Sequence, residues 1–181
     1  MKKVFLTVAI CFAGLATFAQ SRSLGSELSI GAEGAIPVGD LKNITNFGFG
    51  ATLKYAYNFD ETIALTLQSG YIYFPGKDLG AGNKVNLSQI PLKAGIRYSI
   101  NQFYIEPQLG AGFWHGSVSS QALSTLGVNV SDNATMFTYG GGIGVLASRN
   151  FDIGFRFEGA SKDGVKYNFL GLRLAYVFPL K

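Results

Sequence analysis

His115 and Ser117 are the two side chains whose types and spacing could support nucleophilic catalysis. They lie two residues apart, and His115 is the only histidine of the 181-residue chain. On a β-strand such a pair shares one face, where an imidazole can take the proton of a hydroxyl nucleophile. A catalytic pair also needs a group that orients the imidazole, and Asp132, the nearest carboxylate downstream, is expected in a loop. We therefore predict no catalytic residue, and His115 with Ser117 is kept as the alternative.

Charged residues that alternate with apolar ones form a second group with chemical potential. In the segment 151–158, Asp152, Arg156 and Glu158 fall on one face, while Phe155 and Phe157 fall on the other. The same alternation in other segments predicts one shared charged face. Its members are Glu33, Lys54, Lys93, Arg97, Glu106, Arg156, Glu158 and Arg173. Asp152 is expected on this face as well, but near its rim.

Metal, cofactor and nucleic-acid chemistry find no support in the sequence. There is one histidine, and the single cysteine, Cys11, lies in a segment that we expect to be removed. The glycine-rich run 140–144 precedes no helical pattern, so it does not predict a phosphate-binding loop. The formal net charge of +4 includes Lys2 and Lys3, and no longer basic cluster follows them. We expect no cofactor, no metal and no nucleic acid.

The first residues have the features of an export signal. Lys2 and Lys3 precede an apolar run that ends at the small residue Ala19, as in secretory signal peptides. We predict a signal peptide over 1–19 and a short periplasmic tail over 20–27. A barrel is predicted over 28–178 and a C-terminal tail over 179–181.

The elements that must position the charged face are eight stretches of alternating polarity. Their connections alternate between long and short, a rhythm typical of small transmembrane barrels. The predicted fold is all-β, an eight-stranded antiparallel up-and-down transmembrane β-barrel. The expected strands are 28–36, 47–57, 62–74, 87–100, 103–115, 135–148, 151–159 and 167–178.

Aromatic residues near both ends of the strands indicate a membrane rather than a soluble sandwich. Tyr57 and Phe151 lie near short turns, and Phe49 and Phe137 lie near long loops, all on the apolar face. Membrane barrels have such aromatic belts at both interfaces. The charged face then points into a narrow lumen that side chains fill. We interpret it as an ion-paired core that closes the barrel, with a narrow small-solute pore as the alternative.

The chain resembles the small eight-stranded outer-membrane barrels of the OmpA transmembrane-domain and OmpX type. The residues that carry the resemblance best are in the last strand, Gly171, Leu172, Leu174, Tyr176 and Phe178, which look like the signal read by barrel-assembly machinery. The resemblance implies an exported protein of the Gram-negative outer membrane that contacts lipid and lipopolysaccharide. His115 and Ser117 also resemble the pair of the lipid A deacylase barrels, although that family's orienting acid has no match here.

The expected role follows from these interpretations. We predict a monomer without enzyme activity and with a closed charged lumen, which has a structural or surface-interaction role. The longest loop, 116–134, faces outside and would meet a partner that the sequence does not identify. Within it, Val128 and Val130 could extend the hairpin beyond the membrane and offer an edge to another chain. The alternative is a lipid A-modifying enzyme or a pore.

Overall fold

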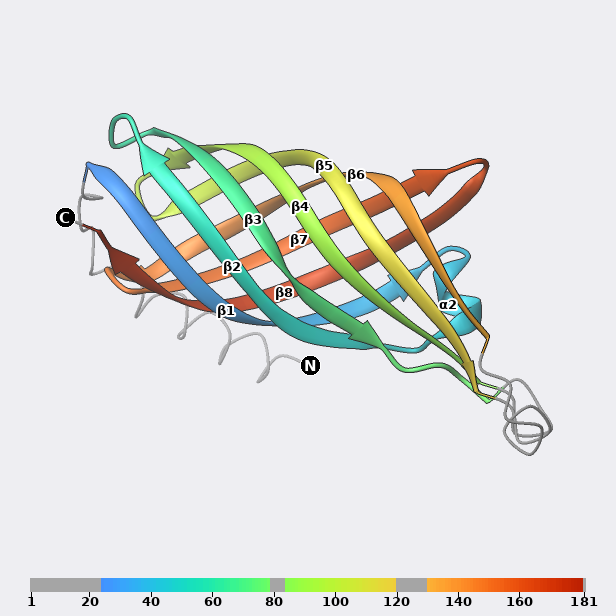
Figure 1. Ribbon diagram of the computed structural model, residues 1–181. Helices are drawn as coiled ribbons and strands as arrows, with labels where there is room; N and C mark the ends of the chain where they lie inside the picture. Colours follow the sequence, from blue (N-terminus) through green and yellow to red (C-terminus); the bar gives the residue numbers. More distant parts are fainter. Residues whose placement is uncertain (1–23, 79–83, 120–129, 181) are drawn as a thin grey trace, which may run out of the picture.

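The computed structural model describes residues 24–78, 84–119 and 130–180, which form one closed β-barrel (Figure 1). One helical turn, α2 (Leu41–Ile44), lies between the first two strands. The strands are β1 (Gly25–Val38), β2 (Gly48–Asn58), β3 (Ile63–Phe74), β4 (Lys84–Ile100), β5 (Phe103–Ser119), β6 (Val130–Ser148), β7 (Phe151–Lys162) and β8 (Val165–Pro179).

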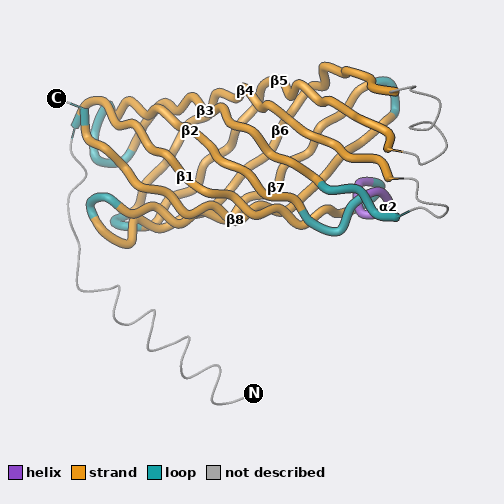
Figure 2. Tube along the Cα trace, turned by 60° about the horizontal axis from the view of Figure 1, so that its bottom comes forward, coloured by secondary structure: helices purple, strands orange, loops and turns teal. Residues whose placement is uncertain are grey.

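Every strand pairs with its sequence neighbours in antiparallel register, and β1 closes the circle by pairing with β8. The closing register runs from Glu27 opposite Pro179 to Val38 opposite Asn168. Figure 2 shows the strands crossing the barrel obliquely, with the turn α2 at one end. Closure satisfies the backbone groups that an open sheet edge would leave bare in lipid. The predicted eight-stranded antiparallel barrel is confirmed.

The two faces of each strand differ in polarity as the alternation predicts. On β7, Phe155 and Phe157 face outward and are exposed, whereas Arg156 and Glu158 face inward and are buried. Outward aromatic side chains lie at both barrel ends, with Tyr57 and Phe151 at one and Phe49 and Phe137 at the other. The outer surface is therefore apolar between two aromatic belts.

Several strands are longer than the sequence pattern indicates. β1 begins at Gly25, inside the segment expected as a tail, and β8 includes Pro179. β5 continues to Ser119 and β6 begins at Val130, so the ends of the expected loop 116–134 are strand. The expected signal peptide 1–19 and the loop positions 120–129 lie outside the described residues.

The connection between β7 and β8 corrects the expected long loop 160–166. It is a two-residue turn at Asp163 and Gly164, flanked by the pair Lys162 and Val165. Both turn residues have positive φ, 49° and 85°, as a type I′ hairpin requires. Asp-Gly is a favoured sequence for that turn, so the strands continue to the turn itself. The alternation of long and short connections therefore fails at this hairpin.

Candidate functional site

The carboxylate of Glu106 organises the lumen near the short-turn end of the barrel. It lies 2.8 Å from Nζ of Lys54 and 2.6 Å from Nε of Arg97. It also accepts hydrogen bonds from Thr66 Oγ1 at 3.2 Å and from Gln108 Nε2. These side chains come from β2, β3, β4 and β5, so one carboxylate joins four strands across the interior.

Asp152 forms a second centre beside the first. It accepts a hydrogen bond from the Tyr104 hydroxyl at 2.6 Å and one from Arg173 Nη1 at 3.1 Å, and Arg97 Nη2 lies 3.7 Å away. The Arg97 guanidinium also covers the Tyr104 ring at 4.3 Å. The sequence analysis placed Asp152 near the rim of the charged face. The structure buries its side chain among these groups, with 1 % exposure.

A third cluster lies further toward the long-loop end. Arg156 Nη2 lies 2.6 Å from Glu33 Oε1 and 3.1 Å from Glu158 Oε2. Lys93 donates to Glu158, and Gln89 Nε2 donates to the other oxygen of that carboxylate at 2.7 Å. This cluster connects β1, β4 and β7.

All eight charged residues expected on one face lie inside the lumen, and none is more than 8 % exposed. Five cations, Lys54, Lys93, Arg97, Arg156 and Arg173, stand with the carboxylates Glu33, Glu106, Asp152 and Glu158 in the three clusters. Loss of one member of such a buried pair strands the other charge and costs about 3–5 kcal/mol. The clusters therefore tie opposite walls of the barrel together.

One glycine on β6 and one on β7 make room for the ring of Tyr104 inside the lumen. A Cβ on Gly144 would lie 2.2 Å from Cζ of Tyr104, and one on Gly154 would lie 3.0 Å from its hydroxyl oxygen. The ring of Tyr104 therefore packs where any larger residue would collide. Within the glycine-rich run 140–144, Gly144 is therefore required by the packing of Tyr104.

The long-loop end of the lumen is apolar, which the sequence analysis did not foresee. Phe74 stacks on Trp114 with ring centroids 5.7 Å apart and meets Phe169 edge-on at 5.5 Å. We call this buried group the apolar cap. Its members are Ala35, Leu41, Ile72, Phe74, Leu87, Trp114, Met136, Ala160 and Phe169. The charged lumen expected from the sequence thus occupies only the short-turn half.

The turn α2 covers the apolar cap at the long-loop end of the barrel. Leu41 is fully buried in it. The hydroxyl of Thr45 lies 2.9 Å from the carbonyl oxygen of Phe47 and 2.8 Å from that of Pro75. The backbone N–H of Lys77 donates to the carbonyl of Ile44 at 2.8 Å. These bonds fasten the first connection to the segment after β3.

His115 lies on the outward face of β5, and its neighbour across the strand pair is Asn133 on β6. Nδ1 of His115 lies 2.8 Å from Oδ1 of Asn133. Asp132, expected in a loop, is part of β6, and its carboxylate accepts the backbone N–H of Asn133 at 2.8 Å. An amide oxygen can orient an imidazole but does not stabilise the imidazolium as a carboxylate does. Ser117 lies opposite Ser131.

The β5–β6 hairpin rises above its neighbours at the long-loop rim. β6 pairs with β5 from Val130 onward, but its pairing with β7 begins only at Phe137, opposite Ser161. Among the described residues, no strand therefore pairs with the second side of residues 130–136. On its other side β5 pairs with β4 from Lys84, opposite Ser119, onward. The segment after β3 covers this part of β4, since Asp78 bridges Lys84 and Asn86 Oδ1 accepts the Gly76 N–H.

The described residues offer neither a membrane-spanning helix nor a metal-binding cluster. No helix in these ranges is long and apolar enough to cross a membrane. No group of three or more His, Cys, Asp or Glu side chains in the described part of the chain is arranged to hold a metal ion.

A closed barrel with an apolar outer surface, aromatic belts at both ends and buried charges inside defines a transmembrane β-barrel. The chain belongs to the outer membrane protein beta-barrel domain family, whose model matches residues 5–178. The protein is therefore placed in the Gram-negative outer membrane. A search of curated proteins gives no match.

Solved structures share the fold. The attachment invasion locus protein Ail of Yersinia pestis is 24% identical over 86% of this chain and 100% of that one, with a TM-score of 0.65. The N-terminal barrel domain of Pseudomonas aeruginosa OprF is 18% identical over 84% and 97%, with a TM-score of 0.52. OprG of the same organism is 12% identical over 90% and 100%, with a TM-score of 0.53. At these identities the likeness concerns the fold alone.

Proposed function

We propose that this protein is a closed, monomeric surface-interaction barrel whose β6 edge binds an extended segment of an external partner. The observation that supports the proposal is the unpaired side of residues 130–136. An exposed strand edge offers backbone donors and acceptors to an incoming strand, a recognition mode known as β-augmentation. Residues 130–136 lie beyond Phe137 of the aromatic belt, so this edge stands outside the membrane.

The edge is partly protected, which gives it selectivity. The carboxylate of Asp132 accepts a hydrogen bond from the backbone N–H of Asn133. Charged side chains on edge strands are a common defence against unspecific pairing. A partner strand must displace that carboxylate or pass around it, and a basic residue in the partner would favour the exchange.

A pore is the less favoured role. The ion clusters join opposite walls through Glu106, Asp152 and Glu158, and the apolar cap fills the other half. A polar solute would have to separate buried ion pairs and then cross apolar side chains. In planar bilayers we expect no discrete conductance, and regular single-channel steps would contradict a closed lumen.

An enzyme is likewise less favoured. His115 has an amide neighbour where a charged orienting group would strengthen a general base. We expect identical lipid A acylation, by mass spectrometry, in cells with the wild type and with His115→Ala. A lost acyl chain that depends on His115 would establish the enzyme instead.

We also propose that the outward side chains of β8 form the signal for the barrel-assembly machinery. Leu172, Leu174, Tyr176 and Phe178 all face lipid. Gly171 faces inward, and a Cβ there would lie 2.7 Å from Glu33 Oε1. Packing inside the lumen thus requires glycine at position 171. The four outward apolar residues are the ones that the assembly machinery would recognise.

Photocrosslinking on intact cells tests the edge. A photoreactive residue at Ser131, on the open side of the hairpin, should give a discrete crosslinked species. The matched control is the same probe at Asp163, in the short β7–β8 turn at the same rim. Equal labelling from both positions, or none from Ser131 at normal surface abundance, would refute binding at this edge.

A further inference from the structure

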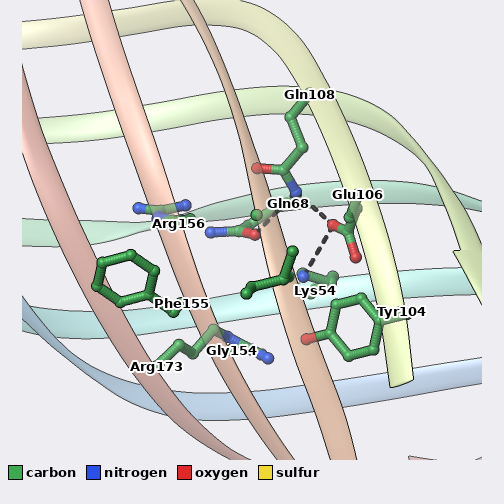
Figure 3. Close-up of a pocket in the computed structure, with 11 residues that line it drawn as sticks. Lys54, Gln68, Tyr104, Glu106, Gln108, Gly154, Phe155, Arg156 and Arg173 are labelled. Atoms are coloured by element: carbon green, nitrogen blue, oxygen red, sulfur yellow. Dashed lines mark hydrogen bonds and ion pairs between the residues drawn. The ribbon is translucent and has the colours of Figure 1, made fainter. Parts of the chain in front are cut away.

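A small cavity lies inside the charged half of the lumen. Its volume is about 30 Å³, and its lining includes Lys54, Gln68, Glu106, Arg156 and Arg173 (Figure 3). A cavity needs roughly 10–15 Å³ of such space to hold one water-sized particle. The site therefore accommodates about two or three water-sized particles and no molecule of ordinary ligand size.

The hydrogen bonds around the cavity fix the direction of its amide groups. The Glu106 carboxylate is an acceptor only, so Gln108 turns its nitrogen toward it. That nitrogen also donates to Oε1 of Gln68 at 3.2 Å. Gln68 therefore faces Gln108 with its oxygen, and its Nε2 points the other way (Figure 3). This Nε2 has no hydrogen-bond partner although Gln68 is only 1 % exposed.

Arg156 contributes further unsatisfied donors. Its Nη2 faces Glu33 and Glu158, but its Nε and Nη1 have no hydrogen-bond partner. Among the side chains that line the cavity, the buried polar atoms without a hydrogen-bond partner are all donors, from Gln68 and Arg156. A buried donor left unsatisfied costs about 1–3 kcal/mol, so a species that accepts from them is stabilising.

The described lining residues also include more positively charged than negatively charged side chains. Lys54, Arg156 and Arg173 border the cavity, while Glu106 is its one carboxylate among the lining residues described. Arg156 is paired with Glu33 and Glu158, and Arg173 is paired with Asp152. The three ion clusters together nevertheless hold five cations and four carboxylates, so one positive charge is in excess. An occupant with negative charge would accept from the free N–H groups and offset the local excess of cations.

We propose that this cavity is a binding site for a small monatomic anion of the halide class, such as chloride. The site has donors and positive charge, which exclude a cation. Its volume excludes phosphate, sulfate and carboxylate ligands, whose several oxygens need more room. The anion is held among the ion clusters, on the short-turn side of the apolar cap. The site therefore binds an ion without conducting it through the barrel.

Bromide replaces chloride in crystals and can be located by its anomalous scattering. Crystals of the barrel grown in sodium bromide should show an anomalous peak in the cavity, within hydrogen-bond distance of Gln68 Nε2. A cavity that holds only a water molecule, or nothing, at molar bromide would overturn the proposal.

A matched pair of variants tests the same site in solution. Gln68→Leu removes a free donor, whereas Gln89→Leu removes a buried lumen amide that does not border the cavity. An anion that binds only the folded barrel stabilises it in proportion to its occupancy. In bromide, compared with gluconate at equal ionic strength, the folded-to-unfolded ratio should rise about tenfold for the wild type and Gln89→Leu, as for a ligand near 10 times its Kd.

Gln68→Leu should show no such dependence on the anion. Retention of the full bromide effect in Gln68→Leu, or its absence from the wild type, would refute the site. If Gln68→Leu does not refold, the anomalous scattering of the wild-type crystals decides the question alone. Neither experiment depends on the β6 edge, so the two proposals stand or fall separately.

Discussion

Replacement of Glu106 by Gln tests whether the ion clusters hold the barrel closed. The change keeps the side-chain size but removes the charge that faces Lys54 at 2.8 Å and Arg97 at 2.6 Å. Because Glu106 is 3 % exposed, water cannot replace the lost carboxylate. The expected cost is about 3–5 kcal/mol of unfolding free energy, or roughly 100- to 4000-fold in the folding equilibrium.

The assay is reversible urea unfolding of the barrel in lipid vesicles. Trp114 is the only tryptophan and is buried in the apolar cap, so its fluorescence reports on the lumen. The double variant Glu106→Gln with Lys54→Met also removes the cation that is left unpaired, since within the described residues the ion pair of Lys54 is with Glu106. It should recover part of the loss. A single variant within 1 kcal/mol of wild type, or a double variant less stable than the single, would refute this reasoning.

Two further substitutions follow from the packing of the lumen. Gly144→Ala places a Cβ 2.2 Å from the Tyr104 ring and should destabilise the barrel by about 1–3 kcal/mol in the same assay, whereas Gly141→Ala, with 3.8 Å to its nearest atom, should be nearly neutral. Equal effects would contradict a packing role for Gly144. Phe74→Ala should cost about 3–5 kcal/mol because it opens the apolar cap. The outward Phe49→Ala should cost much less, and the reverse order would show that the cap contributes little.

The alternation of side chains was sufficient to predict the barrel and its two faces. Arg156 and Phe155 lie on opposite sides of β7 because successive side chains of a strand point in opposite directions. The same rule places Trp114 inside, between the outward Phe113 and His115. That signal was available, but polarity alone does not mark an apolar residue as inward in a membrane barrel. The apolar cap was missed for this reason.

The ion pairs that charged residues form across the lumen could not be predicted from the sequence. Glu33 on β1 meets Arg156 on β7, and Lys54 on β2 meets Glu106 on β5. Such contacts depend on the stagger that accumulates from strand to strand around the barrel. No local pattern reports this stagger. The burial of Asp152 escaped prediction on the same ground, since its closeness to a turn in the sequence indicated a rim.

The division of the lumen into an apolar and an ionic half has a consequence for insertion into the membrane. We expect the long-loop end to cross the hydrocarbon layer before the short-turn end, as in a barrel that inserts from the periplasm. Inward residues at the leading end, such as Phe74 and Phe169, tolerate contact with lipid while closure is incomplete. The charges of Glu106 and Asp152 lie at the trailing end, where water still solvates them. We therefore expect the order of polarity along the barrel axis to make insertion with the long-loop end leading easier than insertion in the opposite direction.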